Sequence, residues 1–277
     1  MIRKSGGAIL VHLALFAAAA VSLMPMIWLL CACFKRGEDL FSSSFLPASL
    51  NRLTLSNFQK LFTQEHFGRW LINSIFLASA QTCLVVFFSS LGGFALCKYR
   101  FAGRKPLMLL LLLTLMLPAP ILIPSGYELM RALGWLDSYL AILVPGAASV
   151  FGALLFKQAM QNVPDELIHA GRIDGCSEFR LWWEIALPIV RPMTGAFTLM
   201  SFLSSWNSYL WPQIVLLDES KYTLPMGLAN MMRLPEYQNE FGVLMCGTLV
   251  SILPVLLLFF ALQKDFIAGL SSGAVKG

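Results

Sequence analysis

Serine and aromatic side chains gather in one apolar run of the sequence, residues 193–217, where their spacing could form a ligand site. Four serines follow one another at intervals of three, one and three residues, which places their hydroxyls on one face of a helix. Aromatic faces pack against the apolar face of a sugar ring, while hydroxyls and amides pair with its OH groups. The run therefore predicts a polar path suited to a sugar. The serines are Ser201, Ser204, Ser205 and Ser208, and the candidate path residues are Ser204, Ser205, Trp206, Asn207 and Ser208, beside Tyr209 and Trp211.

Two simpler interpretations of this pattern stay open. Polar side chains in membrane helices commonly bond to neighbouring helices, each contributing only about 0.6 kcal/mol. Trp211 would also suit the aromatic belt at a membrane surface. The six cysteines are scattered, with no CxxC pair and no cluster with histidine, so the sequence predicts no disulfide framework, no metal site and no catalytic residue.

The composition is that of an integral membrane protein. Hydrophobic residues make up 57% and charged residues 13% of 277 positions, and the mean hydropathy is +0.71, too apolar for an ordinary soluble domain. Six runs approach the ~20 residues that cross the hydrocarbon core. They are residues 8–34, 70–96, 106–127, 138–156, 193–217 and 242–263. The predicted fold class is all-α, a polytopic membrane protein with six transmembrane helices.

Charge and proline positions refine this prediction. The short loop 97–105 is densely basic, which places it in the cytoplasm, and an even number of spans puts both termini there too. The net charge of +5 then reflects membrane topology and lipid contact rather than nucleic-acid binding. Pro118, Pro120 and Pro124 should kink or break the third span before its outer end.

The spans lack the groups that drive ion-coupled transport. No Asp, Glu, Lys or Arg interrupts the six runs, whereas proton- or sodium-driven transporters place ionisable groups inside the membrane. The chain also has no GxxxxGK[ST] phosphate-binding loop, so it does not hydrolyse ATP by the usual route. Active transport would draw its energy from another subunit, and a stand-alone channel or receptor is the alternative.

A polar segment, residues 162–192, lies between the fourth and fifth spans and is predicted to dock a cytosolic partner. Pro164 suits the first turn of a helix, Asp165 and Glu166 favour its positive end, and Gly175 offers a stop. An amphipathic helix lying on the bilayer is the alternative. The face at three- and four-residue spacing is small or apolar, and comprises Leu167, Ala170, Gly171 and Asp174.

The spacing within this segment resembles the cytoplasmic EAA loop of ABC importer permeases. The matching positions are Gly175, then nine residues, Ile185, one residue, Leu187 and Pro188. Where that family has a Glu-Ala-Ala triplet, this chain has His169, Ala170 and Gly171. The salt bridge of the family's glutamate would be missing, and Glu166 or Asp165 would supply charge one turn earlier. Packing is then expected to contribute most of the coupling.

Longer segments are similar to carbohydrate-type, maltose permease-like subunits of these importers. They cover most of the chain after Trp70: KYRFAGRKP at 98–106, LMLPAPILIP at 115–124, ALGWLDSYLAILVP at 132–145, SSWNSYLWP at 204–212, YTLPMGLA at 222–229 and GLSSGAVKG at 269–277. The resemblance implies a single transmembrane permease domain over residues 1–277, with its core at about 70–265, in a bacterial inner membrane. It also implies an irregular C-terminal tail at the cytoplasmic ATPase interface.

The resemblance further implies partners and a division of labour. A second, different permease subunit would complete the translocation path, two ATP-binding subunits would lie beneath, and an extracytoplasmic solute-binding protein above. ATP and magnesium would be bound by the ATPase, leaving this chain without cofactor or enzymatic activity. The cargo would be a sugar, an oligosaccharide or a glycerol phosphate. The implied ATPase-docking residues are Glu166, Leu167, His169, Ala170, Gly171, Asp174, Gly175, Ile185, Leu187 and Pro188.

Overall fold

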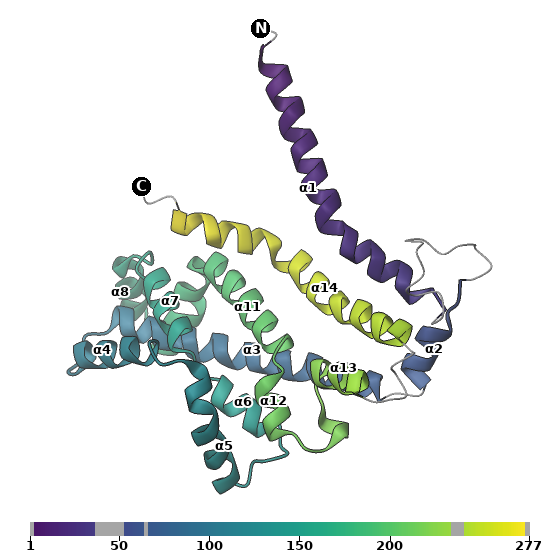
Figure 1. The fold of residues 1–277 in the computed structure, drawn as a ribbon. Coiled ribbons are helices and arrows are strands. Elements are labelled where there is room, and N and C mark those ends of the chain that lie inside the picture. The colour runs from purple at the N-terminus through teal and green to yellow at the C-terminus, as the bar shows by residue number, and fades with distance from the viewer. Residues whose placement is uncertain (1–2, 37–52, 64–65, 234–240, 275–277) are drawn as a thin grey trace. The chain divides into compact units, whose positions relative to one another are not determined.

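A computed structural model describes residues 3–36, 53–63, 66–233 and 241–274, and every regular element in these ranges is a helix (Figure 1). The long helices are α1 (Arg3–Cys33), α3 (Phe67–Lys98) and α14 (Phe241–Ala274). The shorter α-helices are α2 (Ser56–Thr63), α4 (Arg104–Thr114), α5 (Ile123–Ala132), α6 (Leu140–Gly146), α7 (Val150–Met160), α8 (Asp165–Ile173), α9 (Glu178–Arg180), α10 (Leu187–Ile189), α11 (Arg191–Trp206), α12 (Leu210–Val215) and α13 (Leu224–Arg233). Short 3₁₀ helices are η3 (Ala119–Leu122) and η5 (Glu219–Lys221), and η4 (Leu181–Ala186) is a π-helix.

Four helical stretches among the described residues are long and apolar enough to cross a membrane: Ala8–Cys33, Phe67–Lys98, Leu140–Met160 and Phe241–Ile267. Two further pairs of helices pass the same test together but are bent at a short break, by 97° for Arg104–Thr114 with Ala119–Ala132 and by 88° for Glu178–Ile189 with Arg191–Trp206. Counting each bent pair as one crossing gives up to six spans, which is the predicted number. The second pair begins earlier than the predicted fifth span, residues 193–217, because its first half, Glu178–Ile189, belongs to the polar segment 162–192. The chain is an all-α, polytopic membrane protein.

The third span breaks at its prolines, as predicted. α4 ends at Thr114, Pro118 precedes η3 with an extended backbone, and α5 begins at Ile123 with Pro124 in its first turn. Proline has no N–H and clashes with the preceding turn of a helix, so a straight helix cannot pass through this stretch. The 97° bend follows from these positions.

The fifth span is not the continuous helix predicted over residues 193–217. α11 ends at Trp206, Asn207 leaves the helical region at φ −89° and ψ 3°, and α12 begins only at Leu210. Asn207 turns its side-chain amide back to the carbonyl of Leu203 at 2.8 Å, which competes with helix continuation. In a continuous helix, the ring of Pro212 would clash with the carbonyl of Ser208.

The expected irregular tail is also corrected. α14 continues through Ala274, so residues 269–274 are helical, and 275–277 lie outside the described residues. No proline follows Pro254, and extending an existing helix costs far less than starting one.

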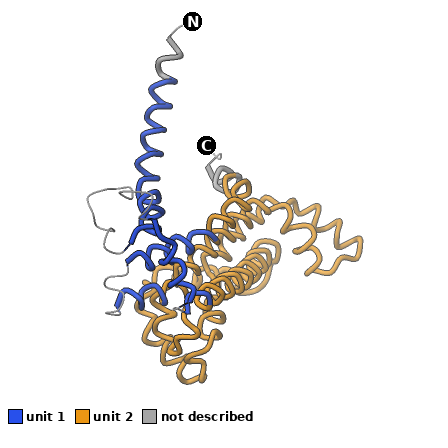
Figure 2. Tube along the Cα trace, turned by 90° about the vertical axis from the view of Figure 1, so that its right-hand side faces the viewer, with its two compact units in different colours: residues 1–68, 227–253 blue, residues 69–226, 254–277 orange. Residues whose placement is uncertain are grey.

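The described chain divides into two compact units (Figure 2), one of residues 1–68 and 227–253 and one of residues 69–226 and 254–277. In the first unit, the buried Asn57 amide donates to the carbonyls of Cys33 at 2.9 Å and Lys35 at 2.8 Å. These bonds satisfy carbonyls at the end of α1 that have no partner within the helix. Most of α1 before this point is exposed and apolar.

The second unit holds the functional elements and has two cores. One core joins α3, α7, α8, η4 and α11 around buried Phe94, Phe156, Trp182 and Phe197. The other packs Leu77, Met130, Ala141, Val215 and Met226 at the opposite end of α3. A Cβ on Gly93 would lie 2.5 Å from the Phe156 Cβ and 2.6 Å from the Lys157 nitrogen, so α3 and α7 cross with their backbones in contact.

Candidate functional site

The polar segment between α7 and α11 folds around one exposed short helix, α8. The helix starts at Asp165, with Asp165 and Glu166 in its first turn, and its end is set by Gly175 at φ +80°. This left-handed conformation favours glycine because a Cβ would be strained there. The backbone N–H of Cys176 then donates to the carbonyl of Gly171 at 2.9 Å, which closes the turn.

The two faces of α8 differ from the prediction. Gly171 was assigned to the outward packing face, but it is buried against the second half of its own loop. A Cβ on Gly171 would lie 2.5 Å from Leu181 Cδ2 and 2.9 Å from Ile185 Cδ1, so its small size serves internal packing. The outward surface instead has Leu167, 44% exposed, and Ile173, 87% exposed. Pattern reasoning missed Ile173; its only signal was an isoleucine closing a polar helix.

The remaining predicted loop residues have distinct places. Glu166, His169, Ala170, Asp174 and Gly175 are exposed. Ile185 and Leu187 pack against the core around Trp182, whereas Pro188 is exposed. Pro188 cannot donate a backbone hydrogen bond, and the π-helical turn of η4 directly precedes it.

Lys98, at the end of α3, fastens the start of α8. Its ammonium donates to the Val163 carbonyl at 2.5 Å and to Asp165 Oδ1 at 2.6 Å, and its side chain is only 6% exposed. The hydrogen bond from Lys98 holds the pKa of Asp165 below its ordinary value. The lysine side chain is thus almost fully buried, with its ammonium held by these two acceptors at the start of α8.

A second set of contacts joins Tyr99, just after α3, to Arg172 of α8 through Glu178. Arg172 donates to both oxygens of Glu178, Nε at 2.8 Å and Nη2 at 3.1 Å, and the Tyr99 hydroxyl donates to the same carboxylate. The Arg172 guanidinium carbon also lies 5.8 Å from the centroid of the Tyr99 ring. Arg172 first and Tyr99 second lower the pKa of Glu178. Tyr99 lies 79 residues from Glu178 in the sequence, so no local pattern could pair these two.

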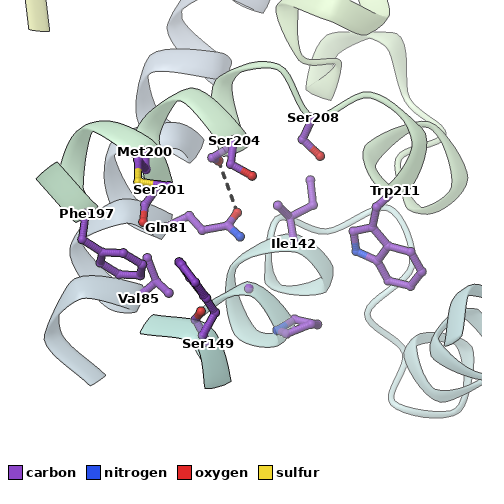
Figure 3. Close-up of a pocket in the computed structure, with 14 residues that line it drawn as sticks. Gln81, Val85, Ile142, Ser149, Phe197, Met200, Ser201, Ser204, Ser208 and Trp211 are labelled. Atoms are coloured by element: carbon purple, nitrogen blue, oxygen red, sulfur yellow. Dashed lines mark hydrogen bonds between the residues drawn. The ribbon is translucent and has the colours of Figure 1, made fainter. Parts of the chain in front are cut away.

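A cavity of about 470 Å³ lies further along α3 and is bordered by α6, α7, α11 and α12 (Figure 3). Gln81 points into it, with Phe197 and Trp211 towards opposite ends. The Ser205 hydroxyl donates to Gln81 Oε1 at 3.4 Å. All four predicted serines line this cavity: Ser201, Ser204, Ser205 and Ser208.

Two predicted path residues lie elsewhere. Trp206 is buried and stacks on Phe202 with 5.7 Å between ring centroids, and Asn207 caps α11, so neither lines the cavity. Trp211 does line it. Its indole N–H donates to the Ala141 carbonyl at 2.8 Å, so this donor is already satisfied within the protein. Gln81 was missed as a cavity residue; its signal was an amide in the middle of the second span.

The chemistry of the cavity is neutral. Among the described residues that line it, polar groups are hydroxyls, one amide and one indole, and none is acidic or basic. Such a surface exchanges hydrogen bonds with hydroxyl groups and packs on an apolar ring face. It supplies no group for covalent, metal or proton chemistry.

A helical membrane protein with an exposed helix fixed between two spans and a neutral polar cavity within the same unit is a membrane subunit of a transporter. Residues 85–269 match the family described as "Binding-protein-dependent transport system inner membrane component". The chain belongs to this family and is a permease subunit, non-enzymatic and multi-pass.

Named relatives match along nearly the whole chain. It is 36% identical to the arabinooligosaccharide transport system permease protein AraQ of Halalkalibacterium halodurans, over 94% of this chain and 93% of that protein. It is 31% identical to the lactose transport system permease protein LacG of Rhizobium radiobacter, over 94% and 93%. It is 30% identical to the maltodextrin transport system permease protein MdxG of Bacillus subtilis, over 96% and 95%.

The fold also matches a solved structure. A chain in the crystal structure of a bacterial ABC transporter involved in the import of the acidic polysaccharide alginate aligns with a TM-score of 0.84 at 22% identity, covering 96% of this chain and 98% of that one. This likeness shows the shared fold.

Proposed function

We propose that this permease carries a neutral sugar or oligosaccharide and that the cavity around Gln81 contacts it. The named relatives are permeases of arabinooligosaccharide, lactose and maltodextrin systems. The cavity supplies hydroxyls, an amide and the Trp211 ring, which suit a carbohydrate. A relative named for sn-glycerol-3-phosphate transport is 33% identical over 74% of this chain. The neutral lining favours an uncharged cargo, because a phosphate would call for a cationic partner.

The proposed assembly has a second permease subunit, two ATP-binding subunits and an extracytoplasmic solute-binding protein. ATP and magnesium bind the ATPase, and this chain needs no cofactor. Residues 1–277 act as one transmembrane domain in a bacterial inner membrane, with both termini in the cytoplasm. Family membership and the dense basic loop 97–105 support this arrangement.

α3 is the observation that carries the proposed coupling. One uninterrupted helix, Phe67–Lys98, carries Gln81 in the cavity and Lys98 in the fastening to α8, about 25 Å apart along its axis at a rise of about 1.5 Å per residue. An ATPase that moves α8 would therefore displace the cavity wall through a rigid element. ATP binding then biases the permease between two conformations.

The proposed contact with the ATPase is the outward surface of residues 166–174. Leu167 and Ile173 supply apolar area, while Glu166, His169 and Asp174 form a polar rim. The other four predicted docking residues shape the loop and do not themselves touch the ATPase. They are Gly175, Ile185, Leu187 and Pro188. An exposed isoleucine surrounded by polar and charged residues fits the apolar core and polar rim of a protein interface.

Co-purification tests the proposal. The tagged chain is extracted in mild detergent, its partners are identified by mass spectrometry, and ATP hydrolysis and sugar uptake are measured after reconstitution. We expect a second permease and an ATPase, with hydrolysis stimulated by a solute-binding protein. Ile173→Asp should lose the ATPase, while Leu55→Asp, at an exposed leucine outside residues 162–192, should keep it. A chain that purifies alone and conducts without ATP would instead be a channel.

A further inference from the structure

The loop that joins α3 to α4 forms a hollow that the transport proposal leaves unused. It encloses about 370 Å³ and lies apart from the cavity around Gln81. Three of its lining residues are basic, and none of the described lining residues is acidic. The lining residues are Arg100, Phe101, Gly103, Arg104, Lys105 and Pro106.

The positive charges of the basic side chains in this hollow are not neutralised by carboxylates among the described residues. Arg104 donates to the Tyr99 carbonyl at 3.2 Å, which is a neutral acceptor. Within the described part of the chain, neither Arg100 nor Lys105 forms an ion pair. Three neighbouring cations without a carboxylate attract a counter-anion. A planar guanidinium with free N–H groups matches the oxygens of a phosphate.

The nearby carboxylates are already engaged. Asp165 accepts from Lys98, and Glu178 accepts from Arg172 and Tyr99. Arg100 adds to the positive field at Asp165 but does not pair with it. The counter-anion of the hollow must therefore come from outside the described chain.

The backbone adds to the same preference. Gly103, at φ +87°, precedes α4 and has no side chain to cap it. In the first turn of α4 the Arg104 N–H donates to the Phe101 carbonyl at 3.4 Å and Pro106 has no N–H, which leaves the Lys105 N–H and the positive end of the helix dipole to favour an anion. The helix end therefore has the same sign of charge as the three side chains that line the hollow.

The surface next to the hollow is apolar. Phe101 is exposed, and α4, of 11 residues, has no buried residue at all. Leu109, Leu110 and Leu113 are all more than half exposed. A ligand that fits both surfaces has a phosphate at one end and hydrocarbon chains at the other.

We propose that Arg100, Arg104 and Lys105 bind the headgroup phosphate of an anionic phospholipid whose acyl chains lie along α4. Basic pockets at the cytoplasmic side of membrane helices suit such headgroups. Because α4 begins one of the two bent pairs that are apolar enough to cross a membrane, the loop before it would lie at the bilayer surface. A zwitterionic lipid binds less well, because its choline group cancels the phosphate charge.

Native mass spectrometry of the purified protein, in its complex or alone, tests this site with phosphatidylglycerol, cardiolipin and phosphatidylcholine as probes. We expect Arg100→Gln with Lys105→Gln to weaken anionic lipid binding about 25-fold, about fivefold for each charge, because one basic side chain near an anionic surface contributes about 1 kcal/mol. Phosphatidylcholine binding should not change. The matched control is Arg36→Gln with Arg69→Gln, exposed basic residues outside the hollow.

Because basic loops also set orientation, cysteine labelling must show the same topology in every variant. Arg100→Gln alone leaves two basic residues in the hollow and should give the fivefold step even if the double variant fails to insert. Equal lipid binding by variants and wild type would overturn the proposal. Inorganic phosphate that competes as well as lipid would reveal a small-anion site. Loss of the ATPase with lipid binding unchanged would reveal a protein contact.

Discussion

The Lys221 ammonium lies 2.5 Å from Asp137 Oδ2 and also donates to the Asp137 carbonyl at 2.8 Å. The same carboxylate accepts the backbone N–H groups of Leu217 and Asp218, both at 3.0 Å. Asp137 has φ 57°, a conformation that only a few residue types adopt readily. One side chain thereby ties the turn before α6 to the segment that follows α12.

This relationship predicts an acid-sensitive clasp. The Asp218 N–H first, and Lys221 next, lower the pKa of Asp137 from 3.8 to about 2. Because the folded-state pKa is depressed, the carboxylate stabilises the protein fully above about pH 4, and this stability is lost as the pH falls from 3.8 towards 2. Melting temperatures in detergent at pH 6 and pH 3 measure the loss.

Asp137→Asn separates charge from backbone strain. Asparagine tolerates the positive φ, so the variant removes mainly the charged interactions, at a cost of about 2 kcal/mol at pH 6. Its melting temperature should then fall less between pH 6 and pH 3 than that of the wild type. An identical acid dependence in both proteins would show that other carboxylates control it.

Glu178→Gln should loosen the coupling between ATP hydrolysis and transport. The change removes the charge that Arg172 and Tyr99 share, and because Glu178 is half exposed, the loss is about 1 kcal/mol, or about fivefold in coupled uptake. Uptake per ATP hydrolysed in proteoliposomes measures it.

Glu184→Gln is the matched control for this change. Glu184 pairs with Arg180 at 2.7 Å and similar exposure, but the pair lies within one short stretch of the loop and does not reach α3. Coupling that falls equally in both variants would argue against the connection through α3.

Gly171→Val should destabilise the coupling loop. The added atoms would overlap Leu181 and Ile185, and because Leu181 is fully buried, relief requires a shift of the core, at about 2 kcal/mol. Ala170→Val introduces the same side chain on the exposed side of α8 and should lower the melting temperature much less, by the weaker helix propensity of valine alone. Equal melting temperatures for the two variants would contradict the inward position of Gly171.

Gln81→Leu should weaken cargo recognition. Losing one hydrogen-bonding amide in the cavity costs about 1 kcal/mol, so the sugar concentration for half-maximal uptake should rise about fivefold. Thr82→Val is the control. Thr82 is the next residue in the sequence, is buried and does not line the cavity, and valine has nearly the same shape as threonine. Unchanged uptake by Gln81→Leu would place the path elsewhere.

Local chemistry predicted much of this fold. Apolar runs gave the spans, Pro118 and its neighbours gave the break of the third span, and Gly175 gave the end of α8. Each of these signals acts within a few residues of itself. The break after Trp206 was missed, because the serine periodicity continues through Ser208 although the helix does not.

Contacts between distant segments could not be predicted in the same way. Glu178 and Tyr99 are 79 residues apart, and Gln81 and Ser205 are 124 apart. Gly171 lies at the spacing expected for an outward docking face of small residues. Only its contact with Leu181 in the folded loop shows that it faces inward. Tertiary packing decides such cases, so the serine face was found while its partner on α3 was not.

The contact at Gly93 restricts how this permease can move. With the α3 backbone against Phe156 and Lys157 of α7, the two helices have no side-chain layer between them along which to slide. A shear motion needs such a layer, whereas a hinge motion does not. We therefore expect α3 and α7 to turn together as one body, with the change in shape absorbed at the bends before and after them.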